Sequence, residues 1–189
     1  LIANVYGQDM TLVPRHRNLI LSLTLESCRF INDICLDALP DTGMLSSAFD
    51  DLKDNKNSDV YCDEYISSLP LKGIPPASLL LKKNGRYMIT KNYDISRGVV
   101  NGTLVELLHY KRHVVQVQLL TGAQTGRIML LPRISCHVTT ENSGLPFAFT
   151  RTQFPMMPAY AVSVHKSQGQ SLHTVGLWID QDCFAHGQL

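Results

Sequence analysis

The residues of this chain that are best suited to chemistry lie together in the run His165-Lys166-Ser167-Gln168-Gly169. The lysine supplies a compact positive charge, and the hydroxyl groups of Ser163 and Ser167 can donate hydrogen bonds to an anion. A glycine lets a backbone or a ligand approach closely. This combination predicts a corner that holds one or two phosphates. A solvated helix end followed by a glycine would show the same pattern, so these residues alone leave both interpretations open.

Residues 158–168, which lead into this corner, fit either a helix or a strand. The alternation in AYAVSV is typical of a strand, whereas Pro158 suits a first helical position and Gly169 suits the residue after a helix. We predict the helix, which places Ser163 and Ser167 on one face at its C-terminal end. The helix dipole repels anions at that end, so phosphate binding there would depend on side chains.

The two ends of the chain predict parts of one α/β sheet. Residues 19–23 predict a short buried strand, and Thr24 is placed to cap a helix that follows it. Apolar residues at helical spacing give that helix its buried face: Cys28, Ile31, Ile34, Cys35, Ala38 and Leu39. Residues 175–179 predict a second buried strand, with Trp178 in the core. A strand–helix unit of this kind is typical of α/β domains.

The middle of the chain predicts an inserted all-β unit. Residues 50–59 predict an exposed loop, and the proline- and glycine-containing stretch 70–76 predicts a domain boundary. Asn84-Gly85 is a strong hairpin signal between the first two of the strands that follow. These strands are expected at 79–83, 87–91, 103–110, 114–120 and 127–131. Their length and spacing suggest a small β-barrel that interrupts the α/β domain.

Composition limits the classes of function. The chain has 44% hydrophobic and 17% charged residues, which is enough for a packed core, and a formal net charge of +1. Any nucleic-acid contact must therefore be local rather than spread over a basic surface. No apolar run approaches the roughly 20 residues of a membrane span, and the start lacks a secretory signal pattern. Five cysteines without a C-x-x-C pair predict a reduced, intracellular protein with no membrane contact.

Other chemistry-bearing patterns in the chain are weaker. Cys183 and His186 could supply two metal ligands, but no second pair has zinc-site spacing, so we predict no metal site. Cys136 and His137 are adjacent, and neighbours in a strand point to opposite faces, which argues against a Cys/His hydrolase. The run VYCDE at 60–64 imitates a magnesium-binding box, but we reject this interpretation because the run follows a polar loop and no phosphate loop precedes it. No G-x-x-x-x-G-K-[ST] phosphate loop occurs in the 189 residues, so we predict no catalytic residue within them.

The chain resembles a known family in several blocks. The run FPMMPAYAVSVHKSQGQSLHTVGLWID resembles the fifth conserved motif of superfamily-one helicases, in the form carried by the petite-integration-frequency (Pif) DNA helicases. It is especially similar to the versions in Helitron-type transposons. ILSLTLESCRFIND at 20–33 resembles the strand–helix block at the start of that family's second motor domain. Further blocks resemble other parts of the family: 45–50, 73–91, 100–103, 151–155 and the terminal HGQL.

The resemblance implies a fold and an activity. The fold is the second RecA-like, P-loop NTPase-type motor domain with an inserted small SH3-like β-barrel. The expected parts are a first motor portion at 1–70, the barrel at 71–150, and a second motor portion at 151–189 that stops before the arginine-bearing motif. The full-length parent would be an ATP-dependent DNA helicase that moves 5′-to-3′ on single-stranded DNA, using ATP and Mg²⁺. The 189 residues alone are expected to bind neither and to hydrolyse no ATP.

The resemblance also assigns roles to individual residues. Candidates for gripping the DNA backbone are Ser163, His165, Lys166 and Ser167. Gln168 and Gly169 are candidates for coupling this grip to the nucleotide state. The barrel would help to enclose the strand through Lys91, Asn101, Gly102 and Thr103. Such contacts would go mainly to phosphates and would tolerate any base sequence.

Several positions depart from the family pattern. Leu23 and Leu25 replace the usual proline and asparagine, Met157 stands where a basic residue is common, and Phe49 interrupts a serine–alanine–aspartate pattern. These departures fit either a divergent active helicase or a decaying transposon copy. A non-enzymatic nucleic-acid or protein interaction module is the alternative. The partners implied are single-stranded DNA, duplex junctions and an N-terminal motor domain, for a monomeric nuclear protein in DNA repair, recombination or telomere maintenance.

Overall fold

The computed structural model describes residues 1–7, 18–52, 63–69, 71, 73–168 and 170–179. Its first sheet is parallel, with the strand order β12-β1-β13: Ala161–Ser163, Asn18–Ser22 and Thr174–Trp178. The central strand β1 was predicted as a buried strand, and this is confirmed. Leu19 and Ile20 are fully buried on opposite faces of the sheet. Each such side chain stabilises the fold by about 1.5–3 kcal/mol.

Two helices, α1 (Ile2–Tyr6) and α2 (Leu25–Asp37), pack against this sheet. The hydroxyl of Thr24 accepts a hydrogen bond from Ser27 N at 3.2 Å, so the predicted cap of α2 is confirmed. Asn32 fixes α2 to β12, because its side chain accepts from Ala161 N at 2.9 Å and donates to Ala161 O at 2.9 Å. The buried face contains Cys28, Ile31, Cys35 and Leu39 as predicted, but Ile34 and Ala38 are exposed.

The prediction of a helix over 158–168 is wrong. This segment contains the end of strand β11 (Met156–Pro158), then β12, and only the short helix α5 (Val164–Ser167). The alternation in AYAVSV was the better guide. Ala161 and Val162 pair with Ile20 and Leu21 of β1 and are buried. The sheet therefore supplies ladder hydrogen bonds and burial that outweigh the helix signals of Pro158 and Gly169, and Gly169 lies outside the described residues.

The strand predicted at 175–179 is present as β13, but it is not buried. Val175 and Leu177 are 45% and 51% exposed, since β13 is at the edge of the sheet. Gly176 is the buried position. A Cβ atom there would lie 2.7 Å from Cγ2 of Val5, so the glycine permits the close approach of α1. Trp178 is partly buried and packs against the main core.

A second sheet has five antiparallel strands in the order β11-β5-β6-β7-β8. The bounds of the last four are Arg86–Ile89, Leu104–Tyr110, Val114–Leu119 and Ile128–Pro132. These agree with the strands predicted from 87 to 131. The pairing of the five strands is linear, so a mixed α/β fold is confirmed whereas a closed SH3-like barrel is not. β11 joins this sheet to the parallel one, because β12 follows it after two residues.

The predicted hairpin at Asn84-Gly85 is wrong in its pairing. The turn exists, with Asn84 at φ 63° and Gly85 N donating to Lys82 O at 3.0 Å. However, β4 (Ser78–Leu81) pairs with β2 (Met44–Ser47), and β5 pairs with β6 and β11. The turn therefore passes the chain from a two-stranded sheet to the five-stranded one.

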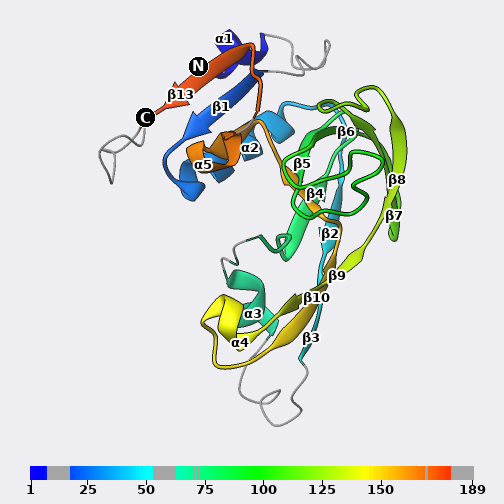
Figure 1. Ribbon diagram of the computed structural model, residues 1–189. Helices are drawn as coiled ribbons and strands as arrows, with labels where there is room; N and C mark the ends of the chain where they lie inside the picture. Colours follow the sequence, from blue (N-terminus) through cyan, green and yellow to red (C-terminus); the bar gives the residue numbers. More distant parts are fainter. Residues whose placement is uncertain (8–17, 53–62, 70, 72, 169, 180–189) are drawn as a thin grey trace.

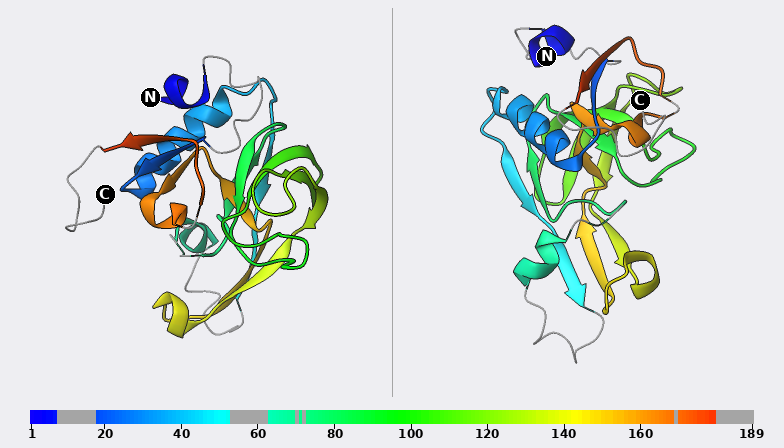
Figure 2. Two further views of the ribbon diagram at one scale, coloured as in Figure 1. Left: turned by 45° about the horizontal axis from the view of Figure 1, so that its top comes forward. Right: turned by 90° about the vertical axis from the view of Figure 1, so that its left-hand side faces the viewer.

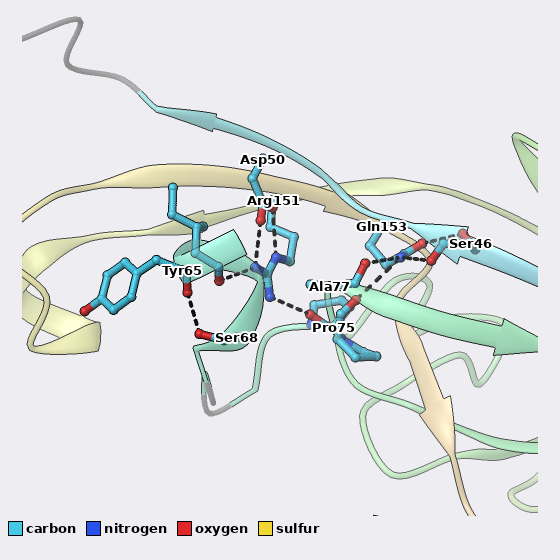
Figure 3. A network of polar contacts seen from close by, with 10 residues as sticks. Ser46, Asp50, Tyr65, Ser68, Pro75, Ala77, Arg151 and Gln153 are labelled. Atoms are coloured by element: carbon cyan, nitrogen blue, oxygen red, sulfur yellow. Dashed lines mark hydrogen bonds and ion pairs between the residues drawn. The ribbon is translucent and has the colours of Figure 1, made fainter. Parts of the chain in front are cut away.

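Three further strands form an arm with the order β3-β10-β9: Phe49–Leu52, Phe149–Gln153 and Ile134–Val138. The loop predicted at 50–59 is wrong at 50–52, which belong to β3; residues 53–62 lie outside the described residues. Arg151 on β10 forms a buried ion pair with Asp50 on β3, with NH2 2.7 Å from Oδ2. Its NH2 also donates to Ile66 O of the helix α3 (Asp63–Ser68) at 3.0 Å. Figure 3 shows the guanidinium of Arg151 facing the carboxylate of Asp50.

Figures 1 and 2 show how these parts are arranged. The parallel sheet and its helices lie beside the five-stranded sheet, and the arm extends away from both, with α3 and α4 (Thr140–Ser143) next to it. One hydrophobic core joins the two sheets, since Ile20 and Ile31 share a cluster with Tyr87, Val105 and Val117. Domain boundaries at 70 and 150 stay a prediction. In the described part of the chain, no helix is long and apolar enough to cross a membrane.

Candidate nucleic-acid interface

A cleft of about 640 Å³ separates one end of the five-stranded sheet from the segment that follows β12. One wall is the turn 100–103 with Thr121 and Gly122, and the other consists of residues of the motif at 165–172. The cleft brings together six of the residues predicted from the sequence: Asn101, Gly102, Thr103, His165, Lys166 and Gln168. Motif residues and turn residues that are far apart in the chain therefore face one space.

Other predicted residues do not line this cleft. Lys91, Ser163 and Ser167 are absent from its walls, and Gly169 lies outside the described residues. Ser163 ends strand β12, so the prediction that it shares a helical face with Ser167 is wrong. The Ser167 hydroxyl donates to Val164 O at 2.7 Å within the short helix α5. Asp63 and Glu64, the last two residues of the rejected magnesium box at 60–64, begin α3. The described residues do not include the rest of that run, Cys183, His186 or the terminal HGQL.

The turn that carries Asn101, Gly102 and Thr103 is fixed by hydrogen bonds on both sides. Gly102 N donates to Ile89 O at 2.9 Å, and Asn101 N donates to the side-chain oxygen of Asn92 at 2.9 Å. The buried hydroxyl of Thr103 donates to Gly98 O at 3.1 Å. Gly102 has φ 90°, a conformation that favours glycine. The backbone N–H groups of Asn101 and Gly102 are thus engaged, which leaves the Asn101 side chain to face a ligand.

Lys166 supplies the positive charge of the opposite wall. Its Nζ donates to the sulfur of Met157 at 3.0 Å, and a thioether is a weak acceptor. Partial burial of the amino group lowers its pKa, while the Cys28 thiol raises it to a smaller extent. Among the described residues, the one hydrogen bond of its Nζ goes to this sulfur atom, and Lys166 is an exposed residue, so the ammonium can turn toward an anion at small cost.

Gln170 joins the two walls. Its Nε2 donates to Gly102 O and to Lys166 O, both at 3.3 Å, and its backbone N donates to Ser167 O at 3.0 Å. Its Oε1 is buried and has no partner among the described residues. The sequence did not single out Gln170, although an amide directly after Gly169 in the same motif was a possible signal. Val100, Met88, Thr121, Gly122, Ser171 and Leu172 were also missed.

The chemistry of the cleft fits a phosphate backbone. Its described walls contain no aspartate or glutamate, and they present an ammonium group, an imidazole and several amides and hydroxyls. Amide and ammonium donors suit anionic oxygens, and they bind a backbone without selecting bases. Cys136 is buried on β9 and His137 is exposed, so they point to opposite faces as predicted. His137 contacts Thr150 Oγ1 at 3.0 Å rather than the thiol.

Comparison with known proteins gives one consistent family, although no family model matches the chain. The ATP-dependent DNA helicase PIF1 of Xenopus laevis is 32% identical over 116 residues, which are 57% of this chain and 16% of that protein. The Mus musculus protein of the same name is 33% identical over 113 residues, covering 58% of this chain and 16% of its own length. The chain thus spans about one sixth of the length of the curated relatives it matches.

Solved structures agree with the sequence matches. A structure of two coordinating Pif1 helicases on forked double-stranded DNA has a TM-score of 0.65 at 20% identity, covering 99% of this chain and 38% of that one. The Pif1 helicase of Candida albicans has a TM-score of 0.61 at 23% identity, covering 84% of this chain and 38% of its own. At these identities the likeness concerns the fold. Together with the sequence matches, it confirms the resemblance drawn from the motifs: this chain is similar to one segment of the Pif1 helicases.

Proposed function

We propose that this chain is the part of an ATP-dependent DNA helicase that holds a single DNA strand. The observation that carries the proposal is the cleft in which the turn at Asn101–Thr103 and the motif at His165–Gln168 face each other. The matched relatives are ATP-dependent DNA helicases by name. One Bacteroides Pif1 structure of similar fold, with a TM-score of 0.63, is a complex with ADP-AlF3 and single-stranded DNA.

The walls of the cleft would share the work of holding the strand. Lys166 acts as the point charge, and the side chains of His165, Gln168 and Asn101 donate hydrogen bonds to neighbouring phosphates. Gly102 and Thr103 shape the wall instead of donating, since the Gly102 N–H and the Thr103 hydroxyl are already hydrogen-bonded. The resulting grip is insensitive to base identity.

The finer features of the proposal come from the family resemblance. They are a second RecA-like motor domain with an SH3-like barrel, 5′-to-3′ movement, and coupling through Gln168 and Gly169. The 189 residues contain no phosphate loop, and the described walls of the cleft contain no carboxylate that could hold Mg²⁺. Nucleotide binding would therefore belong to other parts of a full-length parent, in partnership with a further motor domain. We also propose that the protein is nuclear and monomeric.

Lys166→Ala tests the grip. The variant should bind short single-stranded oligonucleotides of different sequence uniformly more weakly, with a salt-dependence slope smaller by about 1. Fluorescence anisotropy across a salt series measures both quantities. Arg29→Ala is the matched control, because it removes one exposed positive charge from α2 outside the cleft. Unchanged binding by Lys166→Ala, with the control also unchanged, would contradict the proposal and favour a non-enzymatic interaction module.

A further inference from the structure

A second concentration of positive charge lies at the end of the five-stranded sheet opposite the cleft. We call it the basic end and define it by four residues: Lys83, Lys111, Arg112 and Arg133. β6 runs from Leu104, next to the cleft wall, to Tyr110, next to Lys111. The seven residues of β6 are separated by six steps of about 3.4 Å, which place the basic end about 20 Å from the cleft.

Arg133 is the fixed member of the basic end. Its Nε donates to Arg112 O at 3.0 Å, and NH1 and NH2 donate to Ser47 O and Ser46 Oγ, both at 2.8 Å. Its guanidinium also lies over the ring of Phe154, 5.1 Å from the centroid. The structure thus holds one cation in place, while the side chains of Lys111 and Arg112 beside it stay exposed.

The charges of the basic end are not neutralised within the described part of the chain. The two ion pairs among the described residues are Arg97–Asp94 and Arg151–Asp50, and neither involves a residue of the basic end. Burial lowers the pKa of Arg133, and the nearby charge of Arg112 lowers it further. The neighbouring acid, Asp41, accepts hydrogen bonds from Lys83 N at 2.7 Å and Tyr110 OH at 3.0 Å and pairs with no cation of the basic end. Unpaired like charges on a chain of net charge +1 indicate a site for an anionic partner.

We propose that the basic end is a second phosphate-binding surface, which contacts the same nucleic-acid strand beyond the part held in the cleft. The assignment of nucleic acid rests on the proposed function, since the two sites lie on one sheet. At about 3.4 Å per phosphate along a stacked strand, a gap of about 20 Å corresponds to about six nucleotides. A strand of about 4 nucleotides would then reach the cleft alone, whereas one of about 16 would reach both sites.

The test compares two oligonucleotide lengths in the double variant Lys111→Ala/Arg112→Ala. Neither side chain makes a hydrogen bond within the described structure, and Arg112 contributes its carbonyl oxygen, which alanine retains. Binding of 16-mer oligo-dT at 0.1 M salt should weaken by about fivefold for each phosphate that the variant no longer neutralises. The reason is that log K for a single strand falls by about 0.7 per neutralised phosphate for each tenfold increase in salt concentration. Binding of 4-mer oligo-dT should not change. The charge-preserving variant Lys111→Arg/Arg112→Lys should restore the 16-mer affinity.

Unchanged 16-mer binding would overturn the proposal, and so would an equal loss for both lengths, which would indicate damage to the cleft. The outcome is separable from that of the proposed function. If Lys166→Ala leaves 4-mer binding intact while the double variant weakens the 16-mer, the cleft assignment fails and the basic end stands.

Discussion

The side-chain amide of Gln170 donates to the carbonyl oxygen of Gly102, 68 positions earlier in the chain. The same Nε2 also donates to Lys166 O, so one amide ties the turn of the five-stranded sheet to the backbone of the motif. Lys166 and Asn101 therefore face the cleft from walls whose separation is set by a third residue. This link makes Gln170 a positioning residue for the proposed grip.

Gln170→Ala should loosen the two walls. Loss of one modest hydrogen-bonding group costs about 1 kcal/mol, which corresponds to about fivefold weaker binding of single-stranded DNA if the walls must be held for binding. Anisotropy titration measures this, and thermal unfolding checks the fold. The readout specific for positioning is the salt slope, which should stay at the wild-type value because no cation is removed. A slope that falls as it does for Lys166→Ala would contradict the positioning role.

Gly102 should resist substitution because of its backbone. At φ 90° an alanine is strained by about 1–2 kcal/mol, although a Cβ atom would meet nothing closer than 4.0 Å. Gly144 is the matched control, with φ 70° and open space around it. Urea unfolding should show a similar loss of stability for Gly102→Ala and Gly144→Ala. Single-strand binding should weaken in the first alone, and equal binding by both would remove the turn from the interface.

The sequence predicted those elements whose signals are local. Thr24 caps α2 through a residue three positions away, and β1 has an apolar centre, so both could be identified before the structure. The segment 158–163 could not, because its state depends on β1, which is distant in the chain. Pro158 and Gly169 were valid local helix signals, yet pairing of Ala161 with Ile20 decided the outcome.

The residues of the candidate site were likewise predictable where their signals are local, and not where they depend on distant residues. His165, Lys166 and Gln168 came from a compact motif, and Asn101 came from the family resemblance. Gln170 was missed because its function depends on the hydrogen bond to Gly102, which no local pattern reveals. Arg133 was missed for a similar reason, since its three partners come from distant parts of the chain. The motif thus predicted the residues that would contact a ligand, but not the residues that position them.

The ion pair between Arg151 and Asp50 should be a main support of the arm. The Arg151 side chain is 2% exposed and that of Asp50 is 10% exposed. Arg151→Ala leaves a largely buried carboxylate without its partner, so the free energy of unfolding should fall by about 3–5 kcal/mol. Chemical denaturation measures this effect (Figure 3 shows the hydrogen bonds that the substitution removes). Arg97→Ala breaks the exposed pair with Asp94 and should leave stability unchanged within error. Equal effects of the two variants would contradict the structural role given to Arg151.

Cys35 should make the protein less stable in alkali. Burial raises the pKa of this thiol from 9.0 to about 12, so the folded state retains the proton more strongly than the unfolded chain. Stability from this group is therefore fully present below about pH 9 and is lost as the pH rises toward 12. Urea unfolding between about pH 7 and 10 should show a decline that is smaller in Cys35→Ala. At about pH 8, iodoacetamide should label Cys35 in the unfolded chain but not in the folded one, as read by mass spectrometry of its peptide. Rapid labelling of the folded protein would show that the thiol is not held on the buried face of α2.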